Sequence, residues 1–389
     1  MKPARSRFIL YLAGLVLVVA GFMALSGKSD CSRHSTSKAG APSTYHSRGP
    51  SDSLAPRFLP AIESHLDELE KELERMKQER PAFGSAKLLH ACWSAEELRG
   101  TSADKEIIPN VRNPFRGPPS REKPKEALPP LTPDLRGSVR SVRPKDSEKV
   151  AALTFDLCER TGHRTGYDAA IVNYLRREKI KATFFAGGKW MHSHPDKTRQ
   201  LMADPLFELG NHTWTHGNLR LIKGEAMREQ VLWTQAQYEL LREDLARSKC
   251  AKDMPGEMEK IPEAMRVFRF PYGTCSQEAL EFLAGIGLPA IQWDVVTGDP
   301  DPGCRPEDIV DEVMRNIKPG SIIIMHANGY GHGTAQALPL FVPELREKGY
   351  TFLTVSELLK TGPANSRDTC FKLEPGDNKA VDRIYGRGT

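Results

Sequence analysis

The stretch "KVAALTFDL" (149–157) decides the fold class, because it is an apolar, β-prone run that ends in an acid. A helical periodicity follows over 167–180, and "KATFFAGG" (181–188) is a second candidate for a buried strand. Buried strands that alternate with helices are typical of a parallel sheet with crossover helices. The stretch therefore predicts an α/β domain.

The same alternation continues toward the end of the chain. Helical patterns at 199–209 and 224–248 are followed by strand-like and helix-like segments as far as "YTFLTVSELL" (350–359). Repeated strand–helix units over this length fit a barrel better than an open sheet. We therefore predict an α/β domain over residues 148–360, for which periodicity alone does not decide between a barrel and an open sheet.

The N-terminus predicts export. Lys2, Arg5 and Arg7 precede an uncharged apolar run, Phe8–Leu25, which is just long enough to cross a bilayer. Residues 1–26 are therefore either a signal peptide or a membrane anchor, and the rest of the chain is expected on the periplasmic or extracellular face. Export permits disulfides, although the seven cysteines leave at least one unpaired if all pairing is within the chain.

The region before the α/β domain is polar and interrupted. Residues 27–58 are rich in Ser, Gly and Pro and predict a flexible tether, while 59–107 predicts a helical or coiled segment. Leucines at helical intervals within 59–80 could support weak self-association. The Pro-rich stretch 108–134 predicts a semi-rigid linker, and residues 361–389 a polar tail.

The charge of the chain excludes one class of partner. The formal net charge is only +5, and the 55 basic residues are interspersed with 50 acidic ones. A nucleic-acid-binding protein usually concentrates its basic residues in a dense patch or stripe. We therefore expect no nucleic-acid partner.

Residues that could build a site fall at the ends of the predicted strands, where ligands bind in α/β folds. These residues are Asp156, His212, His216, Arg269, Tyr272, Asp294, Asp299 and His326. A lone histidine is more often structural than a ligand, but the joint placement of these groups favours a site. The four-residue spacing of His212 and His216 in "GNHTWTHGN" (210–218) suits a metal-binding pair.

The order of "TFD", "HTWTH", "RFPYG", "GDP" and "IIMH" resembles the polysaccharide deacetylases of the NodB-homology type, carbohydrate esterase family 4. "HTWTH" matches the family's H-[ST]-x-x-H, and "RFPYG" matches its R-x-P-Y. The resemblance covers residues 148–360. It implies a distorted (β/α) barrel with a metal-dependent deacetylase site.

The resemblance also implies roles for individual residues. His212 and His216 would bind a divalent metal, for which two neutral imidazoles suit zinc, cobalt or nickel. Asp156 would be the general base, and His326 the general acid that protonates the leaving amine. The backbone N–H of Tyr272 would help to hold the oxyanion.

Supporting roles follow from the same resemblance. Arg269 would pair with Asp156 and orient it, and Asp299 would raise the pKa of the catalytic histidine. Trp214, Trp293 and Tyr272 would offer apolar faces to a sugar ring, although core packing is an equally good interpretation of Trp293.

The first motif departs from the family, which reads T-F-D-D-G-P where this chain reads "TFDLCE". Leu157 replaces the second Asp, the third metal ligand, and leucine cannot bind a metal. Four alternatives remain: Asp156 could serve twice, Glu159 could reach back, Cys158 could supply a thiolate, or the metal could be weak or absent.

A second departure bears on this choice. Cys158 and Cys275 each follow a motif expected at the same mouth of the barrel, so in an exported protein we expect them to form a disulfide. That bond would consume the thiolate and favour Glu159 as the third ligand beside His212 and His216.

The sequence thus predicts an exported, membrane-tethered, metal-dependent hydrolase that removes acetyl groups from an N-acetylated glycan. Its substrate would be a cell-wall glycan or an exopolysaccharide. Two alternatives stay open at this point: a related amidohydrolase that acts on a small molecule, and a catalytically dead carbohydrate-binding module, which Leu157 favours.

Overall fold

The computed structural model describes residues 83–112, 115 and 117–388. The predictions for 1–26, 27–58 and 59–80 lie outside these residues. Among the described residues, no helix combines the length and the apolar character that a membrane crossing requires.

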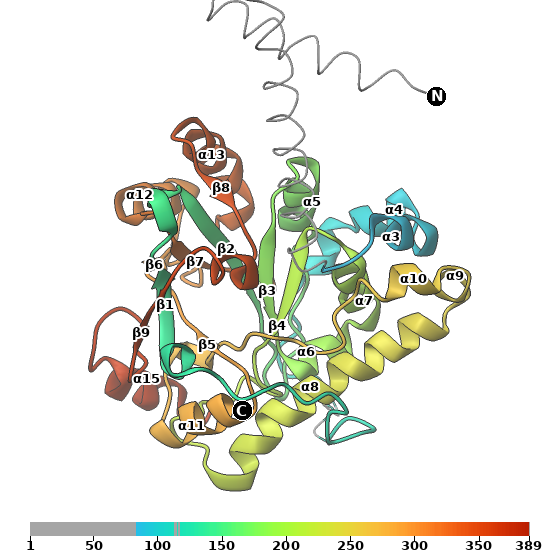
Figure 1. Ribbon diagram of the computed structural model, residues 1–389, viewed down its shortest axis with the longest axis horizontal. Coiled ribbons are helices and arrows are strands. Elements are labelled where there is room, and N and C mark those ends of the chain that lie inside the picture. Colours follow the sequence, from blue (N-terminus) through green and yellow to red (C-terminus); the bar gives the residue numbers. More distant parts are fainter. Residues whose placement is uncertain (1–82, 113–114, 116, 389) are drawn as a thin grey trace, which may run out of the picture. The chain divides into compact units, whose positions relative to one another are not determined.

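The strands β1–β9 form one sheet (Figure 1). Their bounds are β1 (Ser138–Val142), β2 (Val150–Leu157), β3 (Ala182–Ala186), β4 (Phe207–Asn211), β5 (Ala290–Ile291), β6 (Val295–Val296), β7 (Ser321–His326), β8 (Thr351–Phe352) and β9 (Ala364–Arg367). The order across the sheet is β4-β3-β2-β7-β1-β5, while β6 pairs with β7, β8 with β2 and β9 with β1.

The helices surround this sheet in Figure 1. They are α3 (Ala86–Cys92), α4 (Ala95–Arg99), α5 (Ala169–Arg177), α6 (Gly188–Ser193), α7 (Pro195–Ala203), α8 (Gly224–Arg247), α9 (Lys249–Lys252), α10 (Pro255–Met258), α11 (Gln277–Gly285), α12 (Pro306–Asn316), α13 (Thr334–Glu347), α14 (Val355–Leu358) and α15 (Asn378–Tyr385). α13 packs against both α12 and α5, and α8 packs against both α6 and α7.

Strand β2, which contains the stretch "VAALTFDL", lies at the centre of the sheet. All eight of its residues are buried, which explains its nearly continuous apolar run. It pairs in parallel with β3 on one side and β7 on the other. The predicted α/β class is therefore confirmed.

The sheet curls until its two end strands approach the same residue. Phe268 forms parallel bridges with both Asn211 of β4 and Ala290 of β5. The Arg269 N–H donates to the Asn211 carbonyl, and the Ile291 N–H donates to the Phe268 carbonyl. The sheet is therefore curled and barrel-like, with irregular backbone where a regular barrel strand would lie.

Two local predictions needed revision. The helical pattern at 199–209 is wrong in its second half, because α7 ends at Ala203 and β4 begins at Phe207. The sheet also includes β1, which precedes the expected start at 148. The sequence of β1, "SVRSV", contains an arginine, and its strand character comes from pairing with β5 and β9.

The Pro-rich stretch and the polar tail both pack on the domain. Arg121 forms ion pairs with Glu239 and Glu243 of α8. At the other end, β9 pairs with β1, and α15 follows it. These contacts place both segments against the α/β domain.

Candidate functional site

The ends of β2, β4 and β7 bring the predicted residues together. Asp156 on β2 lies directly opposite His326 on the neighbouring strand β7. His212 follows β4, and its N–H donates to the Ala186 carbonyl at the end of β3. The parallel register therefore places two imidazoles and a carboxylate at one edge of the sheet.

The orientation of His212 leaves one ring nitrogen without a partner. Its Nδ1 lies 2.9 Å from the Arg269 carbonyl, which can only accept, so Nδ1 carries the proton and Nε2 has a free lone pair. His212 Nε2 and His216 Nδ1 are both buried without a hydrogen-bond partner. Burial lowers the pKa of both imidazoles, which keeps them in the neutral form that binds metals.

The thiol of Cys158 completes a group of three. The ligand atoms of Cys158, His212 and His216 all lie within 4.8 Å of one another. Cys158 is a free cysteine, and its sulfur accepts a hydrogen bond from Asn328 Nδ2 at 3.1 Å. Two orphaned imidazole nitrogens beside a thiol are the donor set of a divalent-cation site, so these residues fit the metal that the resemblance implies.

Without a cation the thiol is protonated. Burial, together with the charge of Asp156, raises the pKa of Cys158 to about 12. A bound divalent cation reverses this preference, because a coordinating thiol loses its proton. Binding of a cation at this candidate site would therefore release a proton.

Asp156 is held as an ionised carboxylate. It is 3% exposed. Burial raises its pKa, but the charge and the hydrogen bond of Arg269, together with the charge of His326, outweigh burial, so the pKa is lowered. Arg269 Nη1 donates to Asp156 Oδ1 at 2.8 Å, and the other oxygen lies 3.5 Å from His212 Nε2.

Arg269 is itself fixed by its surroundings. Its side chain is fully buried, and its guanidinium lies over the ring of Phe185, 4.0 Å from the centroid. Its Nε and Nη2 donate to the carbonyls of Ile291 and Gln292. The guanidinium is therefore a rigid support for Asp156.

His326, which is partly buried, forms a second pair with the buried Asp299. Asp299 follows β6; its Oδ1 lies 2.9 Å from His326 Nδ1, and its Oδ2 accepts from the His326 N–H. Thr334 Oγ1 also donates to Oδ2. Burial lowers the pKa of His326, but the charge and the hydrogen bond of Asp299 outweigh it and raise the pKa. The contact between Asp299 and His326 is the one that the family resemblance implied.

The loops that carry these residues have strained backbones. Thr213, His216 and Tyr272 have φ angles of 65°, 60° and 59°, in the left-handed region that non-glycine residues rarely adopt. Such strain is often found at functional sites because the surrounding structure must hold it in place.

Glu159 does not contribute to the site, contrary to the prediction. Its carboxylate is 1% exposed and pairs with Lys189 Nζ of α6 at 2.6 Å. It also accepts from the Thr165 N–H and from Ser193 Oγ. The carboxylate is thus engaged in a buried ion pair and is absent from the group formed with His212 and His216.

The predicted Cys158–Cys275 disulfide is also wrong. Cys275 bonds to Cys370, a residue that lies in the predicted tail. A second disulfide joins Cys92 of α3 to Cys250 of α9. Because Cys158 remains free, the thiolate alternative for the third ligand returns in place of Glu159. Two disulfides agree with the expected export.

The aromatic residues are placed differently from the prediction. Trp214 and Trp293 are only 1% and 3% exposed, so neither presents a face to a sugar. Trp293 Nε1 donates to the Lys372 carbonyl. Tyr272 packs against His216, with ring centroids 4.4 Å apart, and its other neighbour is Tyr385 of α15.

Three residues that support this site escaped the sequence analysis: Asn328, Tyr385 and Cys370. Asn328 stands two residues after His326 in "MHANG", so the motif's neighbourhood could have pointed to it. Nothing in the sequence of the polar tail pointed to the other two.

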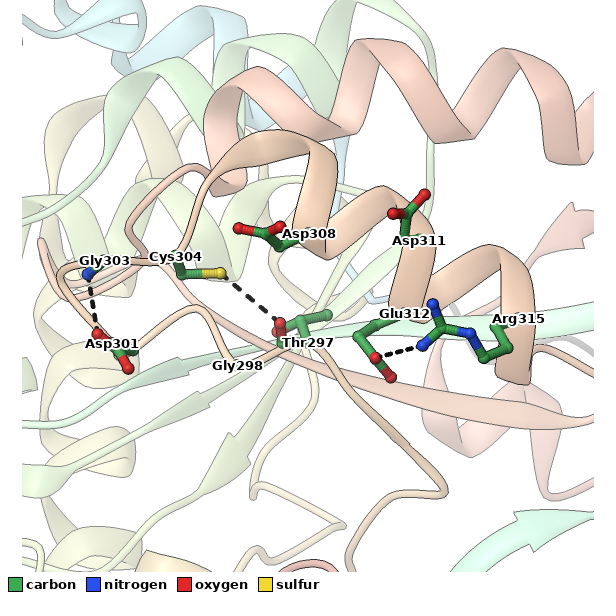
Figure 2. A pocket seen from close by; sticks show the side chains of 9 residues that line it. All are labelled: Thr297, Gly298, Asp301, Gly303, Cys304, Asp308, Asp311, Glu312 and Arg315. Atoms are coloured by element: carbon green, nitrogen blue, oxygen red, sulfur yellow. Dashed lines mark hydrogen bonds and ion pairs between the residues drawn. The ribbon is translucent and has the colours of Figure 1, made fainter.

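A cavity of about 420 Å³ lies apart from these residues, between α12 and the loop that follows β6 (Figure 2). Its lining residues Thr297 and Gly298 precede Asp299, but the lining includes neither His212 nor His216. Two of its carboxylates are already paired, Asp308 with Arg305 and Glu312 with Arg315. Figure 2 therefore shows a feature separate from the candidate site.

Comparison with known proteins identifies the family. Residues 143–291 match the family model described as polysaccharide deacetylase. A chitooligosaccharide deacetylase of Sinorhizobium fredii is 31% identical over 212 residues, which are 51% of this chain and 86% of that protein. The chain belongs to the polysaccharide deacetylase family. The predicted class, a polysaccharide deacetylase-like hydrolase of non-peptide carbon–nitrogen bonds, is thereby confirmed.

Other known proteins are similar to part of the chain. A peptidoglycan-N-acetylglucosamine deacetylase of Bacillus cereus is 29% identical over 212 residues, covering 54% of this chain and 68% of that protein. A solved structure, described as a CE4 family pseudoenzyme from Bacillus anthracis, is 25% identical with a TM-score of 0.48, covering 61% of this chain and 72% of that one.

Proposed function

We propose that this chain is an exported, metal-dependent deacetylase that removes acetyl groups from an N-acetylated glycan of the cell wall or of an exopolysaccharide. One observation carries the proposal. Two buried, partnerless imidazole nitrogens and a free thiol lie within 4.8 Å of one another, beside a carboxylate held by a buried arginine. Relatives that act on peptidoglycan and on chitooligosaccharides support the substrate class.

The metal ligands in this proposal are His212 Nε2, His216 Nδ1 and Cys158 Sγ. The thiolate replaces the carboxylate that Leu157 removes from the family's motif. A thiolate with two imidazoles favours zinc over magnesium or calcium, with cobalt and nickel as alternatives. When bound, such a cation polarises a carbonyl and lowers the pKa of water.

Asp156 acts as the general base. Arg269 keeps its carboxylate ionised and fixes one oxygen, which leaves Oδ2 to accept a proton from water near His212. The Tyr272 backbone N–H is proposed as an oxyanion donor, and the left-handed conformation of that residue supports a specialised role.

His326 acts as the general acid. Asp299 holds the proton on Nδ1 and stabilises the imidazolium, so Nε2 can donate its proton to the leaving amine nitrogen. The two catalytic residues lie on adjacent strands in direct register. In each turnover Asp156 gains a proton from the attacking water and His326 gives its own proton to the leaving amine, and exchange of protons with solvent then restores both side chains.

The location of the enzyme belongs to the same proposal. We propose a periplasmic or extracellular position with residues 1–26 as signal peptide or membrane anchor, which the disulfides support. The proposed division into a tether at 27–58, a helical segment at 59–107, a linker at 108–134, a catalytic domain at 148–360 and a tail at 361–389 comes from the sequence. We extend the proposed catalytic unit to include β1 and β9, because both strands belong to its sheet.

The test measures acetate release from soluble N-acetylglucosamine oligomers, from peptidoglycan and from acetylated xylan, with zinc, cobalt or nickel added to the metal-depleted full chain. We expect release from an N-acetylated substrate, and its loss in His212→Ala/His216→Ala with the circular dichroism spectrum unchanged. Binding of glycans without any acetate release would instead identify a carbohydrate-binding module, and turnover of only small amides would favour the related amidohydrolase.

A further inference from the structure

The segment Cys370–Gly388, which we call the C-terminal segment, is bound to both motif loops of the candidate site. Its first residue forms the disulfide with Cys275, just after "RFPYG". Its last residues contact Asn218, just after "HTWTH": the Asn218 N–H donates to the Arg387 carbonyl, and Asn218 Nδ2 donates to Asp382 Oδ1. These contacts hold α15 beside the site.

A row of three rings leads outward from the candidate metal centre. His216 and Tyr272 have ring centroids 4.4 Å apart. Tyr272 and Tyr385 are stacked, with centroids 4.6 Å apart and an interplanar angle of 22°. Tyr385 therefore stands at the outer end of the row, two rings from a proposed metal ligand.

Tyr385 is also open to solvent, in contrast to Trp214 and Trp293, which the sequence analysis considered as sugar-binding residues. It is 42% exposed, and its neighbour Ile384 is 71% exposed. The Tyr272 hydroxyl donates to the Gly388 carbonyl. This hydrogen bond holds the ring of Tyr272, on which Tyr385 stacks, against the end of the C-terminal segment. An exposed ring on such a rigid support loses little conformational entropy when it binds a ligand.

We propose that Tyr385 is the stacking platform for a sugar ring of the glycan, in a subsite formed by the C-terminal segment. The apolar C–H face of a pyranose packs on an aromatic face, while the tyrosine hydroxyl remains hydrated. This inference rests on the proposed function, and it names the subsite that makes the enzyme prefer an oligomer to a single sugar. Tyr385 binds substrate and takes no part in proton transfer.

The test compares Tyr385→Ala, Tyr385→Phe and Leu373→Ala in the full chain with zinc bound. Leu373 is the matched control, because it is an exposed residue of the same segment, 64% exposed, without a ring. The substrates are soluble N-acetylglucosamine oligomers of graded length and a small acetyl ester. We expect Tyr385→Ala to raise KM for the oligomers by roughly 2- to 10-fold with kcat nearly unchanged.

The controls separate stacking from a structural effect. Tyr385→Phe and Leu373→Ala should keep the KM of the wild type, and all variants should hydrolyse the small ester equally. An unchanged KM in Tyr385→Ala would overturn the proposal, as would an equal loss with the ester or with Tyr385→Phe.

Failure of the proposed function gives a different result. If the wild type releases no acetate from any glycan, calorimetric binding of the same oligomers still tests the subsite. Weaker binding by Tyr385→Ala than by Leu373→Ala would support the platform without catalysis, and equal binding would contradict it.

Discussion

Substitution of Asp299 by asparagine should move the alkaline limb of the pH–rate profile to lower pH. The aspartate oxygen that faces His326 Nδ1 at 2.9 Å becomes an amide, while the other oxygen can still accept from the His326 N–H and Thr334 Oγ1. If the NH₂ group takes the position opposite Nδ1, it donates to that nitrogen, so the neutral ring is stabilised and the imidazolium loses its partner.

The magnitude follows from the geometry of this pair. Asp299 is 1% exposed, so the hydrogen bond belongs to the charged, desolvated class that contributes about 1.5–3 kcal/mol. One pKa unit corresponds to about 1.4 kcal/mol, so the pKa of His326 should fall by roughly one to two units. Because the acid must be protonated, activity is then lost at a correspondingly lower pH.

The assay is the pH dependence of kcat/KM for acetate release from a soluble acetylated oligomer. Asp294→Asn is the matched control, because the Asp294 carboxylate accepts hydrogen bonds from Ser321 Oγ and the Ile322 N–H, neither of which belongs to His326, and burial raises the pKa of Asp294. The control should leave the alkaline limb in place. A limb that does not move in Asp299→Asn would refute the assignment of His326 as the tuned acid.

Two further predictions concern residues that support the site. Lys189→Met should lower the free energy of unfolding by about 3–5 kcal/mol in urea denaturation, because it leaves the buried Glu159 carboxylate without its lysine partner. Lys197→Met, which removes a more exposed ion pair, should lower it by less than about 1 kcal/mol. Equal losses in the two variants would contradict this prediction. Asn328→Ala should weaken zinc binding by about 10- to 100-fold in chelator competition, because the hydrogen bond to Cys158 is lost, and unchanged affinity would show that this contact does not support the ligand.

The sequence predicted the strand ends well, because the carboxyl ends of parallel strands must meet at one edge of the sheet. Asp156, His212 and His326 therefore converge as expected, and Asp299 pairs with the histidine. Arg269 reaches the Asp156 carboxylate for a related reason. It directly follows Phe268, and the irregular segment at Phe268 bridges β4 and β5 and closes the curled sheet.

The remaining features depend on packing between distant parts of the chain, which no local pattern encodes. Cysteine connectivity cannot be deduced from sequence, and the partner of Cys275 lay in a segment that was expected to be a polar tail. The sequence allowed Glu159 as a metal ligand, but in the structure its carboxylate forms an ion pair with Lys189 on α6. Trp214 has a suitable ring, but the burial of that ring is a property of the fold.

The strand boundaries show a similar limit. β1 contains Arg140, whose guanidinium lies 3.9 Å from the ring centroid of Phe371, a contact with the C-terminal segment. Without that partner, the short run "SVRSV" with its arginine gives no strand signal, and the sequence prediction therefore began the domain at 148. Tertiary contacts therefore decided both the start of the sheet and the position of the C-terminal segment.

The central claim is that Cys158, His212 and His216 form a metal site with a thiolate ligand. The most direct measurement is the absorption spectrum of the cobalt-loaded protein, together with its metal content. We predict a thiolate-to-cobalt charge-transfer band with one metal per chain, lost in Cys158→Ser and kept in Cys304→Ser, which alters the other described free cysteine. A cobalt-loaded protein without that band, or metal content unchanged in His212→Ala/His216→Ala, would contradict the account.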